Sequence, residues 1–501
     1  MRKLTVLAML AAVLMAGAAF ARTQHVQPNA TFAFGAAGVA FGPTTTNNDD
    51  TCDISTAPAA TLLLPYFEVD FKSPQTTART TLFTITNVSA LPQIAHVVVW
   101  TDWSFAALDF NIFLTGYDVQ GINLYDIFAR GQIAPPSGTS SATALPLANP
   151  ANAQPAVTNP NIASLANCNA LAAVLPQSIV LDLQNVFTVG KSTGNICSST
   201  TVTIGGVHSN AIGYITVDVV ANCNTSLVAL DPTYFTTSIL FDNVLIGDYQ
   251  DINPNPATGN FAGGNPLVHI RAVPEGGAVG SQPGTNLPVT FYDRYTPALN
   301  RHVDRRQPLP ALFAARYISG GTGNFNTNYK IWREGSVVAQ CSSTMSANGV
   351  IPVTELVKFD EHENASISTG GVIFSPPPAA FGLPEASSQP LTGSVFPSIP
   401  LAAGDVGGWT YLNLNSGLMT RTAPVPAGAV LGAPRASQNW VIVSMSAEGR
   451  FQVDFDAAWL GNGCSGPVAL GTTIGPAGGV LVCPPGVACN QPPVGTNTTP
   501  P

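Results

Sequence analysis

Apolar and polar residues alternate with a period of two through much of this chain. In residues 211–220, the aliphatic residues at 215, 217 and 219 take one face, and Tyr214, Thr216 and Asp218 take the other. Such alternation predicts a half-buried β-strand. Further strands are predicted at residues 80–88, 178–189, 287–292, 329–333 and 409–414.

One pair of strands carries a clear hairpin signal. Residues 440–446 and 451–456 flank the turn sequence Ala-Glu-Gly-Arg at 447–450. In the second strand we expect the apolar residues Phe451, Val453 and Phe455 to face the core. The polar residues between them, among them Asp454, are expected to face water.

Residues 94–103 contain three consecutive valines, so both faces of the strand are apolar and a position inside a covered sheet is predicted. Many short strands and few helical periods predict an all-β fold. We expect antiparallel sheets in a β-sandwich or jelly roll, with long irregular loops and few short helices. Only 9% of the residues are charged, while 46 are Gly and 42 are Pro, which is typical of turn-rich β structure.

Breaks in the strand pattern predict the domain organisation. The uncharged stretch 131–181 predicts a long insertion at 131–177, and residues 365–408 predict a second loop-rich segment. We therefore expect an N-terminal extension at 22–60, a β-sandwich domain at 61–280, a second β-rich domain at 281–465 and a disordered tail at 466–501.

The first 21 residues have the features of a secretory signal peptide. Arg2 and Lys3 precede an apolar run, and Ala19-Phe20-Ala21 forms an A-x-A cleavage pattern. We expect export to the periplasm, the cell surface or the extracellular space. No other stretch has about 20 consecutive apolar residues, so no transmembrane anchor is expected. The net charge of −9 argues against a nucleic-acid partner.

All eight cysteines follow the predicted cleavage site, and an even number in an exported chain favours disulfides. Cys483 and Cys489 flank a Pro-Pro-Gly turn and are predicted to pair with each other. A zinc site is less favoured, because it would need a second such pair or nearby histidines.

The best candidate for a ligand site in the sequence is the segment 96–126, where aromatic residues and carboxylates are dense. Saccharides are bound by aromatic faces beside groups that accept hydroxyl hydrogen bonds. The alternative is that the aromatic residues belong to the core and that the aspartates cap turns. The predicted ligand-binding residues are Trp100, Asp102, Trp103, Asp109, Tyr117 and Asp118, with Tyr125 and Asp126 nearby.

A calcium site is a second hypothesis. Asp251, Asn253 and Asn255 stand at alternate positions, as the oxygen ligands of calcium loops do, and Asp248 is close. Pro256 stands where an EF-hand needs glycine, so an Asx-rich turn is the alternative. No other cofactor is expected.

Basic residues are concentrated between positions 294 and 333. They could receive an anionic ligand such as an acidic polysaccharide. Alternatively they pair with the chain's own carboxylates, for which Asp293, Asp304 and Glu334 are the nearest candidates. The enriched residues are Arg294, Arg301, Arg305, Arg306, Arg316, Lys330 and Arg333.

No esterase elbow and no zinc-protease helix motif occurs in the sequence, so enzymatic activity is not the favoured interpretation. The sequence predicts a binding or structural role at or outside the cell envelope, with a polysaccharide or another surface protein as partner. The alternative is a secreted glycan hydrolase that uses two of Asp102, Asp109, Asp118 and Asp126 as acid and base.

Overall fold

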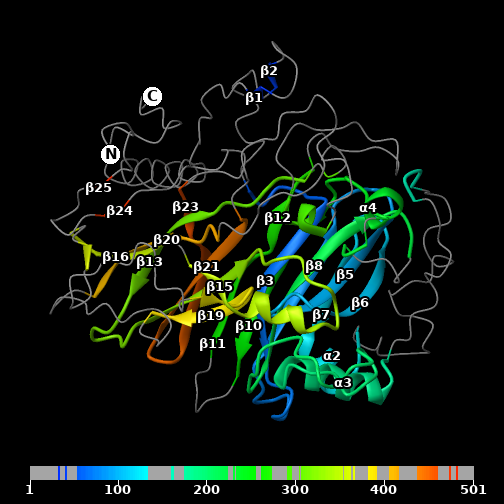
Figure 1. Ribbon diagram of the computed structural model, residues 1–501, viewed down its shortest axis with the longest axis horizontal. Coiled ribbons are helices and arrows are strands. Elements are labelled where there is room, and N and C mark those ends of the chain that lie inside the picture. Colours follow the sequence, from blue (N-terminus) through cyan, green and yellow to red (C-terminus); the bar gives the residue numbers. More distant parts are fainter. Residues whose placement is uncertain are drawn as a thin grey trace, which may run out of the picture.

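Two pairs of antiparallel sheets lie side by side in the computed structural model of this chain (Figure 1). Strands dominate and helices are few, so the predicted all-β class is confirmed. The structure describes residues 32–33, 40–41, 54–133, 159–162, 174–223, 229–231, 233–254, 261–272, 290–295, 304, 306–353, 355–362, 365–366, 382–391, 406–416, 437–460, 473–474 and 481–482.

The N-terminal pair of sheets forms the first half of the molecule. Sheet 1 has the strand order β11-β10-β4-β7, with β9 paired to β4, and sheet 2 has the order β12-β3-β8-β5-β6. Their strands are β3 (Thr61–Val69), β4 (Thr80–Asn87), β5 (Gln93–Thr101), β6 (Ala106–Leu114), β7 (Val119–Asn123), β8 (Ala211–Val220), β9 (Leu245–Ile246), β10 (Asp248–Asn253), β11 (Phe261–Pro266) and β12 (Val268–Ile270).

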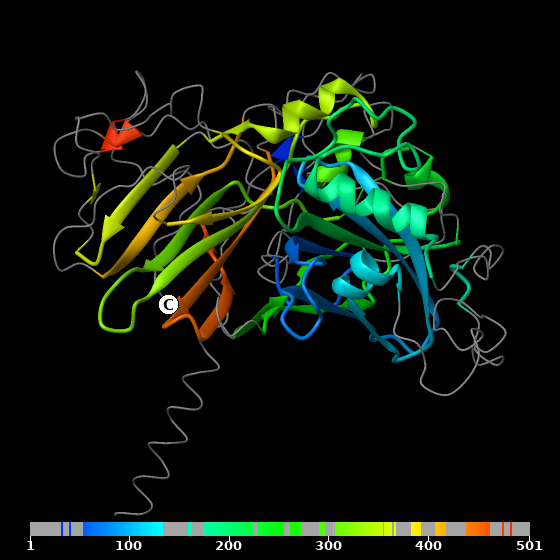
Figure 2. The ribbon, with the colours of Figure 1, turned by 90° about the horizontal axis from the view of Figure 1, so that it is seen from below.

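The second half, seen beside the first in Figure 2, contains the other two large sheets. Sheet 3 has the order β17-β16-β20-β13-β23 and sheet 4 the order β19-β14-β21-β22. Their strands are β13 (Leu312–Ile318), β14 (Asn326–Arg333), β16 (Glu355–Asp360), β17 (Ala365–Ser366), β19 (Ala386–Pro390), β20 (Gly407–Asn413), β21 (Asn439–Ala447), β22 (Phe451–Asp456) and β23 (Ala458–Trp459).

Short strand pairs and a few helices complete the described fold. None of the described helices is long and apolar enough to cross a membrane. The short pairs are β1 (Phe32–Ala33) with β2 (Ala40–Phe41), β15 (Ile351–Pro352) with β18 (Gly382–Leu383), and β24 (Thr473–Ile474) with β25 (Leu481–Val482). The helices are α2 (Leu124–Arg130), α3 (Gln177–Thr188), α4 (Tyr234–Thr237), η2 (Phe291–Tyr295) and η3 (Ser343–Gly349).

Most of the predicted strands are confirmed, including both strands of the hairpin, but two predictions are wrong. Residues 178–189 form most of helix α3, because Val180, Leu183 and Phe187 recur at helical spacing and bury one face. Phe291 and Tyr292 lie in the 3-10 helix η2 rather than in a strand. Residues 287–289 lie outside the described part of the chain.

The predicted orientation of β22 is wrong for Phe451, Val453 and Asp454, whereas Phe455 packs partly buried against the core as expected. Phe451 and Val453 are 64% and 53% exposed, whereas Asp454 is 5% exposed. The polar side of β22 lies against β11, where the Asn265 amide donates a hydrogen bond to Asp456 Oδ1 over 2.8 Å. The polar side of β22 is thus covered because Asp454 and Asp456 meet Tyr249 and Asn265 of the first half of the molecule.

Sheet 2 is covered on both faces. All nine residues of β5 are buried, as predicted for the strand at 94–103, of which residues 94–101 lie in β5. The polar side of β8 is buried as well, so the expectation that β8 is half-buried is wrong. Its Asp218 accepts hydrogen bonds from Tyr234 and Tyr292 over 2.8 and 3.1 Å.

Buried ion pairs connect segments that are far apart in sequence. Arg306 is fully buried and lies 2.9 Å from Asp304 and 3.1 Å from Asp218 of sheet 2. Its guanidinium also lies over the Tyr292 ring, 4.2 Å from the ring centroid. Burial opposes the charged form, but the two carboxylates raise the pKa of Arg306.

A second buried cluster joins sheet 1 to sheet 4. Lys330 Nζ of β14 donates hydrogen bonds to Asp251 over 3.0 Å and to Asp454 over 2.8 Å. Arg79 approaches the same Asp251 to 2.6 Å. Burial alone would raise the pKa of Asp251, but Lys330 and Arg79 hold it below its usual range.

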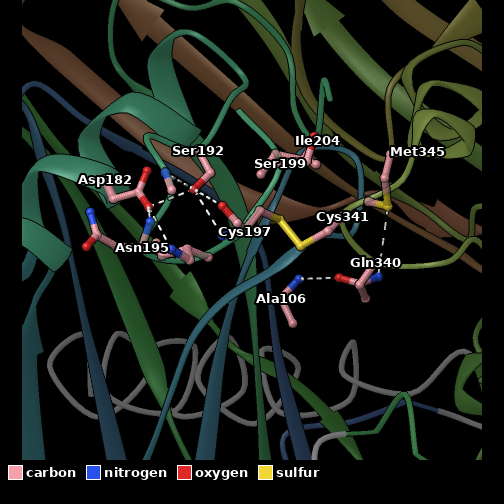
Figure 3. The surroundings of a disulfide bond; sticks show 12 residues. Ala106, Asp182, Ser192, Asn195, Cys197, Ser199, Ile204, Gln340, Cys341 and Met345 are labelled. Atoms are coloured by element: carbon pink, nitrogen blue, oxygen red, sulfur yellow. Dashed lines mark hydrogen bonds between the residues drawn. A yellow bond between two sulfur atoms is a disulfide. The ribbon is translucent and has the colours of Figure 1, made fainter. Parts of the chain in front are cut away.

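A disulfide between Cys197 and Cys341 links the loop after α3 to the segment before η3 (Figure 3). The Cys197 loop is held by Asp182 of α3, which accepts hydrogen bonds from the backbone N–H groups of Asn195 and Ile196. On the other side, the Gln340 side chain accepts a hydrogen bond from Ala106 N over 3.0 Å. Cys223 is also disulfide-bonded.

We predict that the Cys197→Ala/Cys341→Ala double variant lowers the free energy of unfolding by roughly 2–5 kcal/mol, because the bond closes a long loop in the unfolded chain. Chemical denaturation of the oxidised proteins measures this difference. The control is Cys341→Ala alone, which removes the same bond and should give nearly the same loss. An unchanged midpoint in the double variant would contradict a stabilising role.

Candidate functional site

The outer face of sheet 3 carries a group of aromatic side chains. Along β20, Thr410 and Leu412 are buried toward sheet 4, so Trp409 and Tyr411 lie on the opposite side. Phe359 of β16 belongs to that outer side by the same alternation. We call Phe359, Trp409, Tyr411 and Arg316 the aromatic face.

The register of three strands places its central members in one row. Trp409 of β20 is opposite Phe359 of β16 on one side and opposite Arg316 of β13 on the other. The Phe359 and Trp409 rings are stacked, with centroids 4.2 Å apart and an interplanar angle of 12°. Both rings are partly exposed, and Arg316 is exposed.

The backbone below this row is fixed by close contacts. Tyr317 Oη donates a hydrogen bond to Phe359 O over 2.9 Å, which ties β13 to β16. Residue 408 must be glycine, because a Cβ there would lie 2.0 Å from Phe359 O. The hydroxyls of Tyr329 and Thr410 are 2.9 Å apart on the inner side of β20. The aromatic rings therefore stand on a rigid support.

Two charged groups lie beside the stacked rings. Glu361, just after β16, places Oε1 2.6 Å from the position that a Cβ on Gly407 would take, so its carboxylate lies over β20. Arg316 is at the β13 end of the row. The ion pairs between described residues do not include Arg316. The face thus combines ring surfaces with one acceptor and one donor group.

The structure does not assemble the segment 96–126 into one ligand surface. Trp100 is 1% exposed, is stacked on Tyr214 at 5.7 Å and donates a hydrogen bond from Nε1 to Thr216. Asp102 is also buried, and its carboxylate receives the Gly206 N–H and contacts His208 Nε2 at 2.9 Å. These two residues form part of the interior, in agreement with the alternative that the aromatic residues of the segment belong to the core.

The other members of that segment lie in separate places. Tyr117 is 71% exposed in a turn. Asp118 caps this turn by accepting hydrogen bonds from Thr115 N and Val119 N. Trp103 is partly buried and contacts Gly349 at the end of η3.

Asp109, Tyr125 and Asp126 also have local structural surroundings. Burial raises the pKa of Asp109, and its Oδ2 has no hydrogen-bond partner. The hydroxyl of Tyr125 donates to Ser73 O, and Asp126 pairs with Arg130 one helical turn away. The described carboxylates of this segment thus have separate surroundings.

The residues of the calcium hypothesis do not form a common site, because Asp248 and Asp251 of β10 have different surroundings. Asp251 is occupied by Arg79 and Lys330, whereas Asp248 is exposed and accepts a hydrogen bond from the Thr84 hydroxyl over 2.6 Å. Asn253 ends β10, and Asn255 lies outside the described residues. In the described part of the chain, no three His, Cys, Asp or Glu side chains come together as metal ligands would.

Four members of the basic segment 294–333 are buried and bonded within the molecule. Arg294 lies 2.6 Å from Glu385, and Arg333 donates to the carbonyl groups of Pro352 and Leu414. Arg306 and Lys330 have the carboxylate partners given above. Of the partners expected from the sequence, Asp304 is confirmed, whereas Glu334 accepts a hydrogen bond from Gln438 N. Arg301 and Arg305 lie outside the described residues.

Several other predictions fall on residues that the structure does not describe. These are the signal peptide at 1–21, the pair Cys483–Cys489, and most of the insertion and the tail. Comparisons of the chain with known protein families, with curated proteins and with solved structures find no match.

The sequence contained a signal for the aromatic face. Trp409-Thr410-Tyr411 places two aromatic residues on one side of a strand, and Val357-Lys358-Phe359 does the same for apolar residues. Neither segment stands out by its number of aromatic residues. Only the strand order β16-β20-β13 brings Phe359 and Arg316 to the two sides of Trp409.

We predict that Lys330→Met lowers the free energy of unfolding by about 3–5 kcal/mol, because Asp251 and Asp454 lose a buried cation. Lys358→Met is the matched control, since the only described partner of Lys358 Nζ is the carbonyl group of Leu391 at 2.8 Å. Urea denaturation of both variants measures the difference. Equal losses in the two variants would show that the carboxylates do not depend on Lys330.

A pH-dependent difference is expected for Lys358. Burial lowers its pKa from 10.5 to about 8 in the folded protein. Between these two values the unfolded chain binds a proton that the folded chain does not, so wild-type stability should rise with pH relative to Lys358→Met. Below about pH 8 the difference should be constant. Denaturation of both proteins from pH 7 to 10.5 measures it, and parallel curves would contradict the lowered pKa.

Proposed function

We propose that this protein is an exported, disulfide-stabilised β-sandwich protein that binds saccharides through the aromatic face, at or outside the cell envelope. The observation that carries the proposal is the stacked pair Phe359 and Trp409. The pair is partly exposed on the outer side of a sheet, with the guanidinium of Arg316 at its β13 end and the carboxylate of Glu361 nearby over Gly407.

The chemistry of this surface fits a pyranose ring. The C–H groups of a sugar pack on an aromatic face, and its hydroxyls need donors and acceptors at the rim. Because β13 adjoins β20 on the side away from Phe359, the second face of the Trp409 ring is turned toward β13 and Arg316. A sugar stacked there would reach both the ring and the guanidinium.

A rigid support favours binding further. The strands below the aromatic face are paired along their length and joined by the Tyr317 and Tyr329 hydroxyls. Side chains held in this way lose little conformational entropy when a ligand binds. Flat, prearranged faces of this kind suit polymeric or surface-attached ligands.

Two features support the export part of the proposal. The first 21 residues resemble a signal peptide, and the disulfide Cys197–Cys341 requires an oxidising compartment in most organisms. Saccharide ligands are abundant at cell surfaces, which agrees with such a location.

We do not retain the glycan hydrolase as a second candidate. The carboxylates of Asp102, Asp118 and Asp126 are engaged by His208, by a turn and by Arg130, which leaves Asp109 without a second carboxylate to act with it. The Asp102–His208 pair resembles part of a hydrolytic triad, but among the described residues no hydroxyl or thiol group bonds to His208.

We predict that Trp409→Ala weakens the retention of a bound polysaccharide by roughly 10–100-fold in Kd without unfolding the protein, because the central ring of the face is lost. Affinity electrophoresis against a panel of neutral and acidic polysaccharides identifies the ligand, and calorimetry with a fragment of it gives Kd. Trp409→Phe, which keeps a smaller ring, should lose less.

Tyr117→Ala is the control, since this exposed aromatic residue lies in the first half of the molecule. It should bind as the wild type does. If Tyr117→Ala loses binding and Trp409→Ala does not, the saccharide surface is the segment 96–126. If the wild type binds no polysaccharide of the panel, the proposed function is wrong.

A further inference from the structure

We infer that the aromatic face selects saccharides that carry a carboxylate, with the carboxylate of a uronic acid residue bound by Arg316. This inference rests on the proposed function and names its ligand class. It arises from the different positions of the basic residues between 294 and 333.

The four buried members of this group are satisfied inside the molecule. Lys330, Arg294 and Arg306 meet carboxylates at 2.6 to 3.1 Å. Arg333 donates to backbone carbonyl groups. Their positive charge is therefore not presented to a ligand.

Arg316 differs from them in both exposure and surroundings. It is exposed on the outer side of β13, and no ion pair joins it to another described residue. A guanidinium offers a planar fork of donors that matches a carboxylate in a bidentate geometry. It is thus suited to an acid group on a sugar that is stacked on Trp409.

The register gives the contact its geometry. Arg316 and Trp409 are directly opposite each other on neighbouring strands, and directly opposed side chains are about 5 Å apart at Cβ. The carboxylate of a uronic acid is attached to the pyranose ring by a single bond. A ring stacked on Trp409 can therefore place its carboxylate over β13.

Glu361 makes the face asymmetric. Its carboxylate lies over Gly407, on the side of the row away from Ala314 and Tyr411. A second negative group would be repelled there and attracted to Arg316. The acidic sugar should consequently bind with its carboxylate at Arg316 and away from the Gly407 end of the face.

Because the net charge of the protein is −9, an acidic ligand is attracted only by the local contact with Arg316 and not by the protein as a whole. A long polyanion is repelled by the molecule as a whole, whereas one uronate at the face gains the local contact with Arg316. The preference for the acid should therefore persist with short oligosaccharides.

Trigalacturonate and its methyl ester test this inference by calorimetry, since esterification removes the charge and keeps the sugar rings. We expect the wild type to bind the acid at least about tenfold more tightly than the ester, as a charge-assisted bidentate contact provides. Arg316→Gln should bind the acid only as well as it binds the ester. Arg316→Lys should recover part of the preference.

Arg450→Gln is the matched control, because it removes an exposed positive charge at the β21–β22 turn. It should keep the wild-type preference. Equal binding of acid and ester by the wild type would overturn the inference and leave saccharide binding intact. A preference that survives Arg316→Gln would also overturn it. Failure of the wild type to bind these ligands and every polysaccharide of the panel would instead reject the proposed function.

Discussion

The pairing of buried cations with carboxylates from distant segments is the interaction on which this architecture depends. Arg306 reaches Asp218 of sheet 2, and Lys330 of sheet 4 reaches Asp251 of sheet 1. A buried charge without a partner costs several kcal/mol, so each cation fixes the position of the segment that carries its partner. In a chain with only 9% charged residues, this use of charge determines how the two halves meet.

The same constraint explains why the faces of the sheets differ from the sequence prediction. Alternation correctly located β4, β8, β20 and the β21–β22 hairpin. It could not show which side is inside, because the rule that polar residues face water fails where a cation is buried. Asp218 and Asp454 point inward to Arg306 and Lys330, and Phe451 is turned outward as a result.

Helix α3 shows a second limit of the periodicity argument. Its sequence is rich in β-branched and apolar residues, and short apolar runs of this kind fit both a strand and a helix. The decision comes from tertiary contacts. Phe187 packs against Phe67 and Phe128, and Asp182 binds the backbone of the following loop. Neither partner can be identified from the local sequence.

The candidate site was not found from the sequence, where only aromatic residues that are close together along the chain stand out. The residues of the aromatic face are close together only across the strands of a sheet. The segment 96–126 is rich in aromatic residues and carboxylates, yet Trp100 is buried in the interior and Tyr117 is exposed in a turn. Phe359, Trp409 and Arg316 are separated in sequence but adjacent in register. Because the other described cations of the basic segment are buried and bonded within the molecule, Arg316 is the one among them whose charge faces outward. The aromatic face therefore combines aromatic rings with one outward-facing cation, because charged residues are few and the strand register places Arg316 beside Trp409.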